Sequence, residues 1–154
     1  MAKTYIKNNA DLPNWVGKEL PPSEWVTITQ EMINQFAEST GDHQWIHVDV
    51  ERCKKESPYK TTIAHGFLTL SLIPSLRAAS IQMDPARMGI NYGLNKVRFT
   101  GPVPVNSRVR AVFKLLKVES LPDNGAQQTW ETTIYREGSD RPVVVAETLG
   151  RRFE

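Results

Sequence analysis

The sequence predicts an α+β fold in which a curved antiparallel sheet wraps around a central buried helix. Residues 65–81 are apolar on nearly every side, which is typical of a helix surrounded by other elements. From residue 90 onward, apolar and polar residues alternate between turn signals, as they do in antiparallel strands. A sheet with one apolar face needs a covering layer, and the apolar helix is the element that can supply it.

The size and composition indicate one globular domain. The chain has 154 residues and shows neither an internal repeat nor a linker, so we expect a single domain over residues 1–154. Residues 1–24 contain three prolines and a glycine and are expected to form an extended arm. A formal net charge of +2 offers no concentrated positive charge for a nucleic acid. The sequence has neither a secretory signal nor an apolar run of about 20 residues, so we expect a cytoplasmic protein without membrane contact.

Two helices are expected before the central one. Thr29 is a suitable N-cap for the first, and Gly41 is the residue that ends it. Asp49 can cap a second, shorter helix that stops at Ser57-Pro58. Within the central helix, Pro74 removes a backbone donor, and a kink is expected there. The first helix carries its apolar residues at helical spacing: Met32, Ile33, Phe36 and Ala37.

The strands are expected to form a meander. Turn signals at residues 122–125 and 138–140 separate three long segments, which short turns would join in antiparallel order. The first of these alternates basic residues with apolar ones, which predicts one wet and one buried face. Its apolar residues are Val109, Ala111, Phe113 and Leu115.

The loop after the first helix places Asp42 and His47 five residues apart. A carboxylate and an imidazole have pKa values on either side of neutrality, so together they can hold a water molecule and divide its proton transfers. An Asp and a His in a loop also serve as a cap and a hydrogen-bond partner. The spacing alone leaves both interpretations open.

Gly66 stands where the central helix begins. A helix N-terminus offers unpaired N–H groups and a partial positive charge, and a glycine lets a ligand approach the backbone closely. The alternative is that Gly66 packs against a strand while His65 bonds locally. Position alone favours this alternative.

Neither a metal site nor a cysteine nucleophile is expected. His43, His47 and His65 with Asp42 would be the metal-ligating set, but they match no zinc signature and no cysteine joins them. Cys53, the single cysteine, lies in a charged segment and is expected to be an ordinary exposed or half-buried thiol.

Three separated motifs resemble the MaoC-like dehydratases, also called the hydratase 2 family. They are residues 40–49, with the sequence TGDHQWIHVD; Ala64-His65-Gly66; and residues 90–99 with the following 102–105. The first motif is similar to a bacterial branch that includes NodN-like proteins and mycobacterial (3R)-hydroxyacyl-thioester dehydratases. The resemblance runs from about residue 25 to the C-terminus. The more familiar wording has Asn and Pro at Gln44 and Trp45, so the pocket is expected to be shaped differently there.

The resemblance implies a hot-dog fold and (R)-specific addition of water to a trans-2-enoyl-CoA, or the reverse dehydration. It implies that Asp42 and His47 are the catalytic pair and that the Gly66 N–H binds the thioester oxygen. His65, Gln44 and Asn91 are candidate substrate-binding residues. It also implies a homodimer with active sites near the subunit interface and a tunnel for the acyl chain. No cofactor is expected besides the coenzyme A or acyl carrier protein of the substrate.

Two other functions compete with the hydratase. Hot-dog proteins commonly hydrolyse acyl thioesters, but a thioesterase usually has a carboxylate on or near the central helix, and residues 66–80 contain neither Asp nor Glu. A non-catalytic acyl-thioester binding subunit has little use for the Asp42 and His47 pair. A basic set either meets the phosphates of coenzyme A or forms a solvated strand face: Lys96, Arg98, Arg108 and Arg110.

Overall fold

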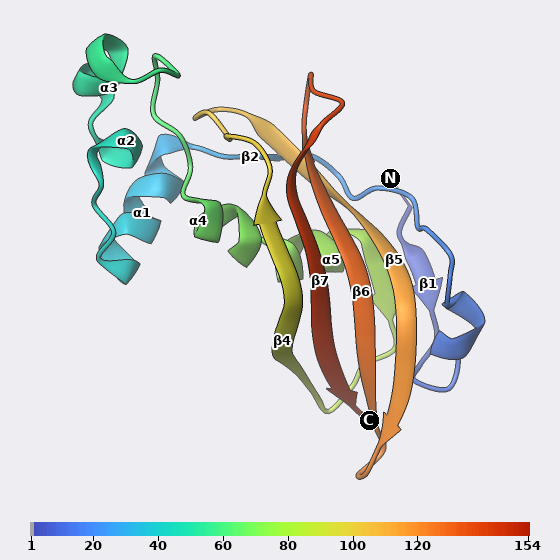
Figure 1. The fold of residues 1–154 in the computed structure, drawn as a ribbon. Helices are drawn as coiled ribbons and strands as arrows, with labels where there is room; N and C mark the ends of the chain where they lie inside the picture. Colours follow the sequence, from blue (N-terminus) through green and yellow to red (C-terminus); the bar gives the residue numbers. More distant parts are fainter. Residues whose placement is uncertain (1) are drawn as a thin grey trace.

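The computed structural model describes residues 2–154 and contains a five-stranded antiparallel sheet that curves around a central helix pair (Figure 1). The strand order is β2-β5-β6-β7-β4. The predicted α+β fold, with its curled sheet and central helix, is confirmed. The strands of the sheet are β2 (Val26–Thr27), β4 (Met88–Phe99), β5 (Arg108–Leu121), β6 (Gly125–Arg136) and β7 (Pro142–Phe153).

Three helices precede the central pair and gather beyond one end of the sheet (Figure 1). They are α1 (Gln30–Thr40), α2 (Trp45–Val48) and α3 (Val50–Glu56). The Thr29 hydroxyl accepts a hydrogen bond from the backbone N–H of Met32, and Gly41 ends α1 in the left-handed conformation, with φ of 80°. Asp49 lies between α2 and α3, and its carboxylate caps α3 by accepting a hydrogen bond from the backbone N–H of Arg52. The predicted caps of both helices are therefore confirmed.

The central helix is broken into α4 (Gly66–Ser71) and α5 (Ile73–Ser80). Pro74 lies in the first turn of α5, where the missing N–H would have no helical acceptor in any case. The sequence predicts a kink at Pro74, and in the structure the helix is interrupted two residues earlier, at Leu72. The expectation of a helix covered on nearly every side is wrong at its first turn, because Phe67 is 66% exposed. The buried side chains of the pair are Leu68, Thr69, Ile73, Leu76 and Ser80.

The meander β5-β6-β7 supplies most of the wall that faces the helix pair. All four apolar residues that alternate along β5 are fully buried, as their spacing predicts. Asp123 and Asn124 form the β5–β6 turn with positive φ angles, a conformation that Asp and Asn tolerate better than most residues. Trp130 on β6 is fully buried and packs edge-on against Phe113.

The N-terminal arm is more structured than the sequence predicts. Its strand β1 (Thr4–Ile6) pairs in parallel with β3 (Ile81–Met83), which follows α5 directly. A short 3-10 helix, η1 (Leu12–Trp15), comes next. Ile6 and Leu12 are fully buried, so the arm closes the core as well as wrapping it.

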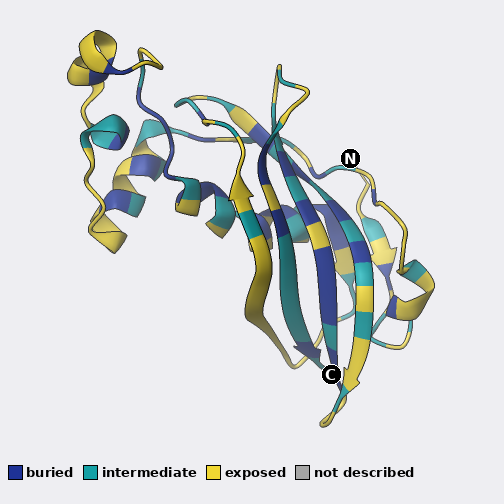
Figure 2. Ribbon diagram, in the orientation of Figure 1, coloured by how far each residue is buried: buried dark blue, intermediate teal, exposed yellow. Residues whose placement is uncertain are grey.

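Strand β4 is an edge of the sheet and is exposed along almost its whole length (Figure 2). Its apolar side chains Ile90, Tyr92, Leu94 and Phe99 are each more than two-fifths exposed. An edge strand with apolar side chains is a surface on which another strand can pair. Among residues 2–154, no helix is long and apolar enough to cross a membrane.

Candidate active site

The loop after α1 presents Asp42 at the surface. Gly41 turns the chain out of the helix, and Asp42 follows on irregular backbone. The Asp42 carboxylate accepts a hydrogen bond from the backbone N–H of Gln44, at 3.3 Å. Gln44 thus holds the carboxylate through its main chain, while its own side chain is exposed.

His47 lies on α2 and is buried. Its Nδ1 lies 2.7 Å from the carbonyl oxygen of Ile63. Because a carbonyl oxygen only accepts, Nδ1 carries the proton, and the neutral ring keeps a basic lone pair on Nε2. Burial lowers the pKa of His47 below the ordinary imidazole value, against a smaller opposing effect of the bond to Ile63. At neutral pH His47 is therefore a neutral base with a defined orientation.

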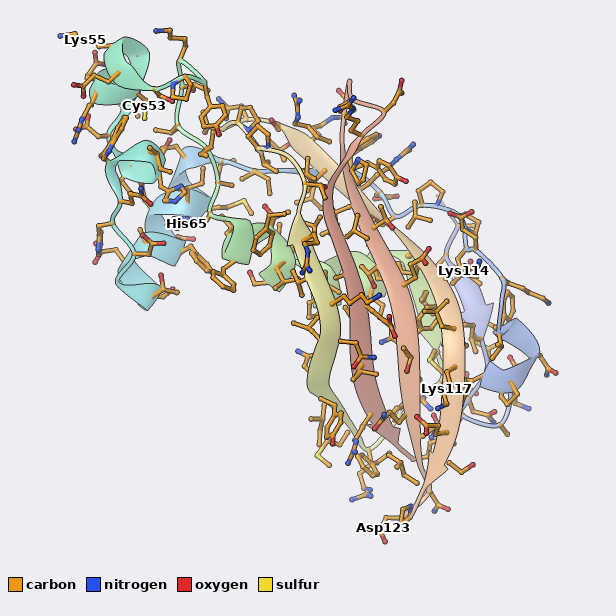
Figure 3. All side chains as sticks on the ribbon, viewed as in Figure 1. Cys53, Lys55, His65, Lys114, Lys117 and Asp123 are labelled. Atoms are coloured by element: carbon orange, nitrogen blue, oxygen red, sulfur yellow. The ribbon has the colours of Figure 1, made fainter. Side chains whose placement is uncertain are left out.

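His65 connects the two predicted catalytic residues. Its ring stacks on that of His47 with 3.8 Å between the centroids, and its Nε2–H donates to the backbone carbonyl of Asp42 at 3.0 Å. Its Nδ1 is buried without a hydrogen-bond partner. One carboxylate oxygen of Asp42 and one ring nitrogen from each histidine all lie within 4.8 Å of one another. The fold thus brings two distant motifs to one place (Figure 3 labels His65).

A side-chain amide fastens the segments that carry these groups. Gln30, the first residue of α1, donates to the backbone carbonyl of His47 at 2.9 Å and accepts from the hydroxyl of Thr62 at 2.5 Å. The N–H of Ile63 also donates to the carbonyl of Ile46. Such buried polar bonds restrict the segments to one relative placement.

A cavity of about 340 Å³ opens beside His47 and Gly66. A Cβ on Gly66 would lie 3.0 Å from the ring of Phe99, so that no larger residue fits without movement. As the first residue of α4, Gly66 has no helical acceptor for its N–H. Asp42 does not line this cavity and stands beside it, at the surface.

Thr69 was missed by the sequence analysis. It lines the same cavity, and its hydroxyl is buried without a hydrogen-bond partner. A native buried hydroxyl without a partner calls for an explanation, and a ligand in the cavity would provide one. The signal in the sequence was a threonine one turn after Gly66, within the helix that was expected to be buried.

The remaining predicted residues lie elsewhere. Asn91 is on β4, away from Asp42 and His47, and lines two other cavities. His43 is exposed and bonds Glu38 at 2.8 Å, so it does not join the metal-type cluster considered from the sequence. Cys53 is fully buried, with its Sγ near two carbonyl oxygens of α2, which corrects the expectation of an exposed or half-buried thiol (Figure 3). Burial raises the pKa of the Cys53 thiol, which makes it a poor nucleophile.

Known proteins resemble this chain over most of its length. Residues 11–134 match the family described as MaoC like domain. The chain is 53% identical to 3-hydroxyacyl-thioester dehydratase Z of Mycobacterium tuberculosis over 142 residues, 92% of this chain and 93% of that protein. It is 44% identical to nodulation protein N of Rhizobium leguminosarum, over 89% of this chain and 86% of that protein. Among solved structures, the unliganded R-hydratase PhaJ1 from Pseudomonas aeruginosa is similar, with a TM-score of 0.73 and 26% identity, over 96% of this chain and 86% of that one.

Proposed function

The chain belongs to the MaoC-like family and is a hydro-lyase, and we propose that it hydrates trans-2-enoyl thioesters to (3R)-hydroxyacyl thioesters, reversibly, with Asp42 and His47. The observation that carries the proposal is the grouping of the Asp42 carboxylate with the two imidazole rings beside the cavity at Gly66. The (3R) configuration is part of the proposal, and the similarity to an R-hydratase supports it.

The proposed substrate position starts from Gly66. The thioester carbonyl accepts a hydrogen bond from the Gly66 N–H, and the Thr69 hydroxyl one turn later is a second donor in the same cavity. Negative charge develops on this oxygen when water adds to the β-carbon. Donors already in place stabilise that charge without reorganisation.

The proposed proton transfers follow from the tautomer of His47. In hydration, Asp42 and His47 both hold the attacking water, and the basic Nε2 of His47 takes a proton from it as its oxygen bonds to the β-carbon. The pair delivers one proton to the α-carbon. Dehydration runs the same steps backwards. The pair therefore ends each turnover with the number of protons with which it began.

The proposed reaction needs no cofactor, and the acyl group arrives on coenzyme A or on acyl carrier protein. Asp42, His47 and His65 also have the composition of a metal site. Each histidine bonds a backbone carbonyl through one nitrogen and keeps the other, as metal-ligating histidines also do, so removal of metal ions is the test that separates the two uses of this set. Unchanged turnover after dialysis against a chelator is the expected result.

The proposal includes a homodimer formed through β4. Within residues 2–154, this edge strand has no strand on its outer side, and it exposes apolar side chains, as Phe67 of the neighbouring α4 does. A second copy that pairs with β4 would cover the apolar side chains of this strand and Phe67, and it would lie next to the cavity at Gly66. Sedimentation velocity should show a dimer that Tyr92→Lys dissociates; a monomeric wild-type protein would contradict this part of the proposal.

The test is hydration of crotonyl-CoA by the purified protein, followed by the absorbance of the enoyl thioester. Asp42→Asn and His47→Asn should each lower the rate by about 10³-fold, the usual size of a lost acid–base group. Free thiol release instead of hydration would identify a thioesterase. Absence of turnover with crotonyl-CoA, with longer enoyl chains and with carrier-protein-linked chains would favour a non-catalytic binding subunit.

A further inference from the structure

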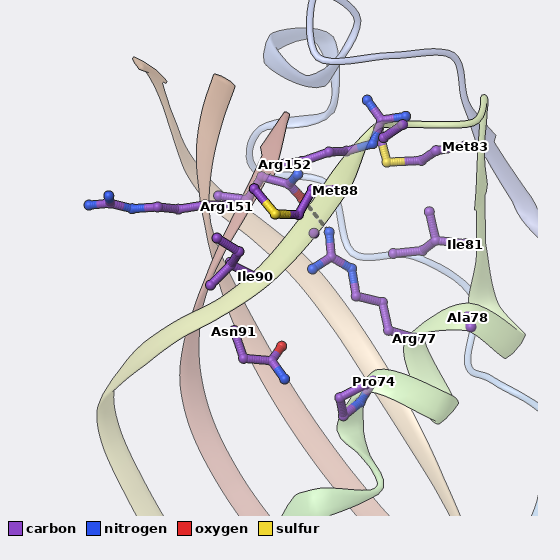
Figure 4. A pocket seen from close by; sticks show the side chains of 14 residues that line it. Pro74, Arg77, Ala78, Ile81, Met83, Met88, Ile90, Asn91, Arg151 and Arg152 are labelled. Atoms are coloured by element: carbon purple, nitrogen blue, oxygen red, sulfur yellow. Dashed lines mark hydrogen bonds between the residues drawn. The ribbon is translucent and has the colours of Figure 1, made fainter. Parts of the chain in front are cut away.

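The far end of the central helix carries one charged residue, Arg77 on α5, the only one in the segment 66–80. Its guanidinium reaches under the sheet to β6, where Nη2 donates to the side-chain oxygen of Gln128 (Figure 4). The same oxygen accepts from the indole N–H of Trp130 at 2.9 Å, and the guanidinium lies 4.8 Å from the centroid of that ring. The arginine is thus fixed by neutral partners.

No carboxylate within residues 2–154 forms an ion pair with Arg77. The neighbouring cation, Arg152, is buried and pairs with Glu154 at 2.6 Å. Burial, followed by the charge of Arg152, lowers the pKa of Arg77 to about 10, so the guanidinium remains charged at neutral pH. A cation held among neutral groups is costly unless an anion joins it.

A cavity of about 470 Å³ opens at this guanidinium (Figure 4). Its lining includes Arg77, Arg151 and Arg152 but neither an Asp nor a Glu. Arg151 extends away from the cavity and lies over the ring of Tyr92, and Arg152 pairs with Glu154. Arg77 is therefore the arginine that faces the cavity without an acidic partner in the described chain. The rest of the lining is largely apolar.

Two donors at this cavity have no hydrogen-bond partner in the described chain. The Nη1 of Arg77 lies beside Gly150 on β7, where a Cβ would be only 3.4 Å from it. Asn91 faces Gly150 in the β4–β7 register, and its side-chain amide makes no hydrogen bond within residues 2–154. Figure 4 shows Asn91 and Arg77 on opposite sides of the opening. Both donors line the same cavity.

An apolar pocket lies between this end and the proposed thioester site along the helix pair. The pocket, of about 370 Å³, shares Arg77, Asn91 and Gly150 with the arginine cavity and adds leucines from α4, β4 and β7. Its first helix residue, Leu70, follows Thr69 of the Gly66 cavity. In one straight helix, the eleven steps from Gly66 to Arg77 would span about 16 Å at 1.5 Å per step, and the break between α4 and α5 changes this only locally. Along the helix pair, the three cavities are lined in turn by residues within 66–69, 70–77 and 74–78, and this row of cavities is called the seam below.

We propose that this seam binds an acyl chain with a carboxylate at its far end, so that Arg77 and Asn91 select ω-carboxyacyl thioesters. The inference rests on the proposed hydratase function. A guanidinium presents two parallel N–H groups that match a carboxylate, and the amide of Asn91 adds a neutral donor. The apolar pocket takes the methylene chain between the two polar ends.

The experiment compares matched trans-2-enoyl-CoA substrates that end in a methyl group or in a carboxylate, over a series of chain lengths. The measured quantity is kcat/KM for the substrate that ends in a carboxylate, divided by kcat/KM for the substrate of the same length that ends in a methyl group. We expect this ratio to exceed about tenfold at the length that reaches Arg77, as is usual where a site is built for a polar group. In Arg77→Gln the ratio should fall to about one, and Gly150→Ala should lower it partly by crowding Nη1.

Arg141→Gln, which removes an exposed arginine in the β6–β7 turn, is the matched control and should keep the wild-type ratio. If Arg77→Gln fails to fold, Asn91→Leu and Gly150→Ala carry the test. A ratio near one at every length, or a high ratio that persists in Arg77→Gln, would overturn the inference. So would dissociation of a dimer by Arg77→Gln, which would assign the guanidinium to a carboxylate of the second copy.

A free fatty-acid anion offers the same chemistry and is tested separately. If dodecanoate inhibits turnover through Arg77 while the ratio stays near one, the site binds free carboxylates and the substrate inference is wrong. If the wild-type protein does not hydrate crotonyl-CoA, the proposed function fails and not the inference about Arg77, because this substrate is too short to reach Arg77. The two failures are therefore distinguishable.

Discussion

The two ends of the α4–α5 helix pair hold their polar groups in different ways. At the first end, the rings of His47 and His65 each donate to a backbone carbonyl, so that the protein sets their tautomers and orientations. At the second end, Arg77 uses one nitrogen to bond Gln128, and its Nη1 has no acceptor in the described chain. An imidazole with a fixed tautomer is suited to proton transfer. A guanidinium N–H without an acceptor is suited to binding an anion.

After the two catalytic variants, the largest effect should come from narrowing the cavity at Gly66. In Gly66→Ala, the new methyl group meets the Phe99 ring at about 3.0 Å and narrows the approach to the backbone N–H. We expect kcat/KM for crotonyl-CoA to fall about 100-fold, the usual loss for one oxyanion donor. Gly89→Ala is the control, because a Cβ there meets nothing within 4 Å. Equal activity of the two variants would remove Gly66 from the mechanism.

A smaller loss of kcat is expected when the hydrogen bond between His65 and the Asp42 carbonyl is removed. His65→Phe keeps a ring against His47 but loses the bond to the Asp42 carbonyl. We expect kcat to fall about 30-fold with little change in KM, because a catalytic group that is slightly misplaced loses rate rather than affinity.

An NMR titration of His47 separates this positioning role from a general loss of structure. The charge of His65 contributes to lowering the pKa of His47, so the pKa should rise in His65→Phe. A normal kcat in this variant would show that the Asp42 loop holds itself in place.

The Thr69 hydroxyl should matter for turnover without mattering for stability. Thr69→Val replaces a buried hydroxyl that has no partner, so the free energy of unfolding should stay level or rise. If the hydroxyl donates to the substrate, kcat/KM should fall about tenfold, the value of roughly one hydrogen bond. Thr69→Ser should restore most of it. A stable and fully active valine variant would assign the hydroxyl no role with substrate.

The smallest effect is expected in the pH dependence of stability. The pKa of His47 is lower in the folded protein than in the unfolded chain, so the unfolded chain binds the proton more readily. The free energy of unfolding should therefore decrease as the pH falls through the ordinary imidazole pKa towards the lowered one, and level off below it. Urea unfolding at several pH values should show a shallower decrease in His47→Asn. Equal slopes would mean that burial does not perturb His47.

Much of the fold follows from local patterns. The caps at Thr29 and Asp49, the stop at Gly41 and the interruption near Pro74 each rest on the chemistry of one or two residues, and each is where the sequence places it. The alternation along β5 likewise identifies its buried face. The family motifs identify the fold, and they predict Asp42, His47 and Gly66 as the functional residues.

Contacts between distant segments were outside the reach of the sequence. The stacking of His47 on His65, the bond from Gln30 to the His47 carbonyl and the unpartnered hydroxyl of Thr69 depend on where α1, α2 and α4 meet. Periodicity does not specify such placements, because it reports which face is buried and not what that face contacts.

The sequence by itself determined the element types, their caps and the identity of the chemical groups, because these depend on neighbours within a few residues. The tertiary structure alone decided the rest: which nitrogen of each histidine is bonded, that Asn91 lies at the opposite end from Asp42, and that Arg77 faces a cavity lined by no carboxylate. The physical reason is that hydrogen bonds and burial in a folded domain join residues that are far apart in the chain. Such bonds form only when the whole chain has folded.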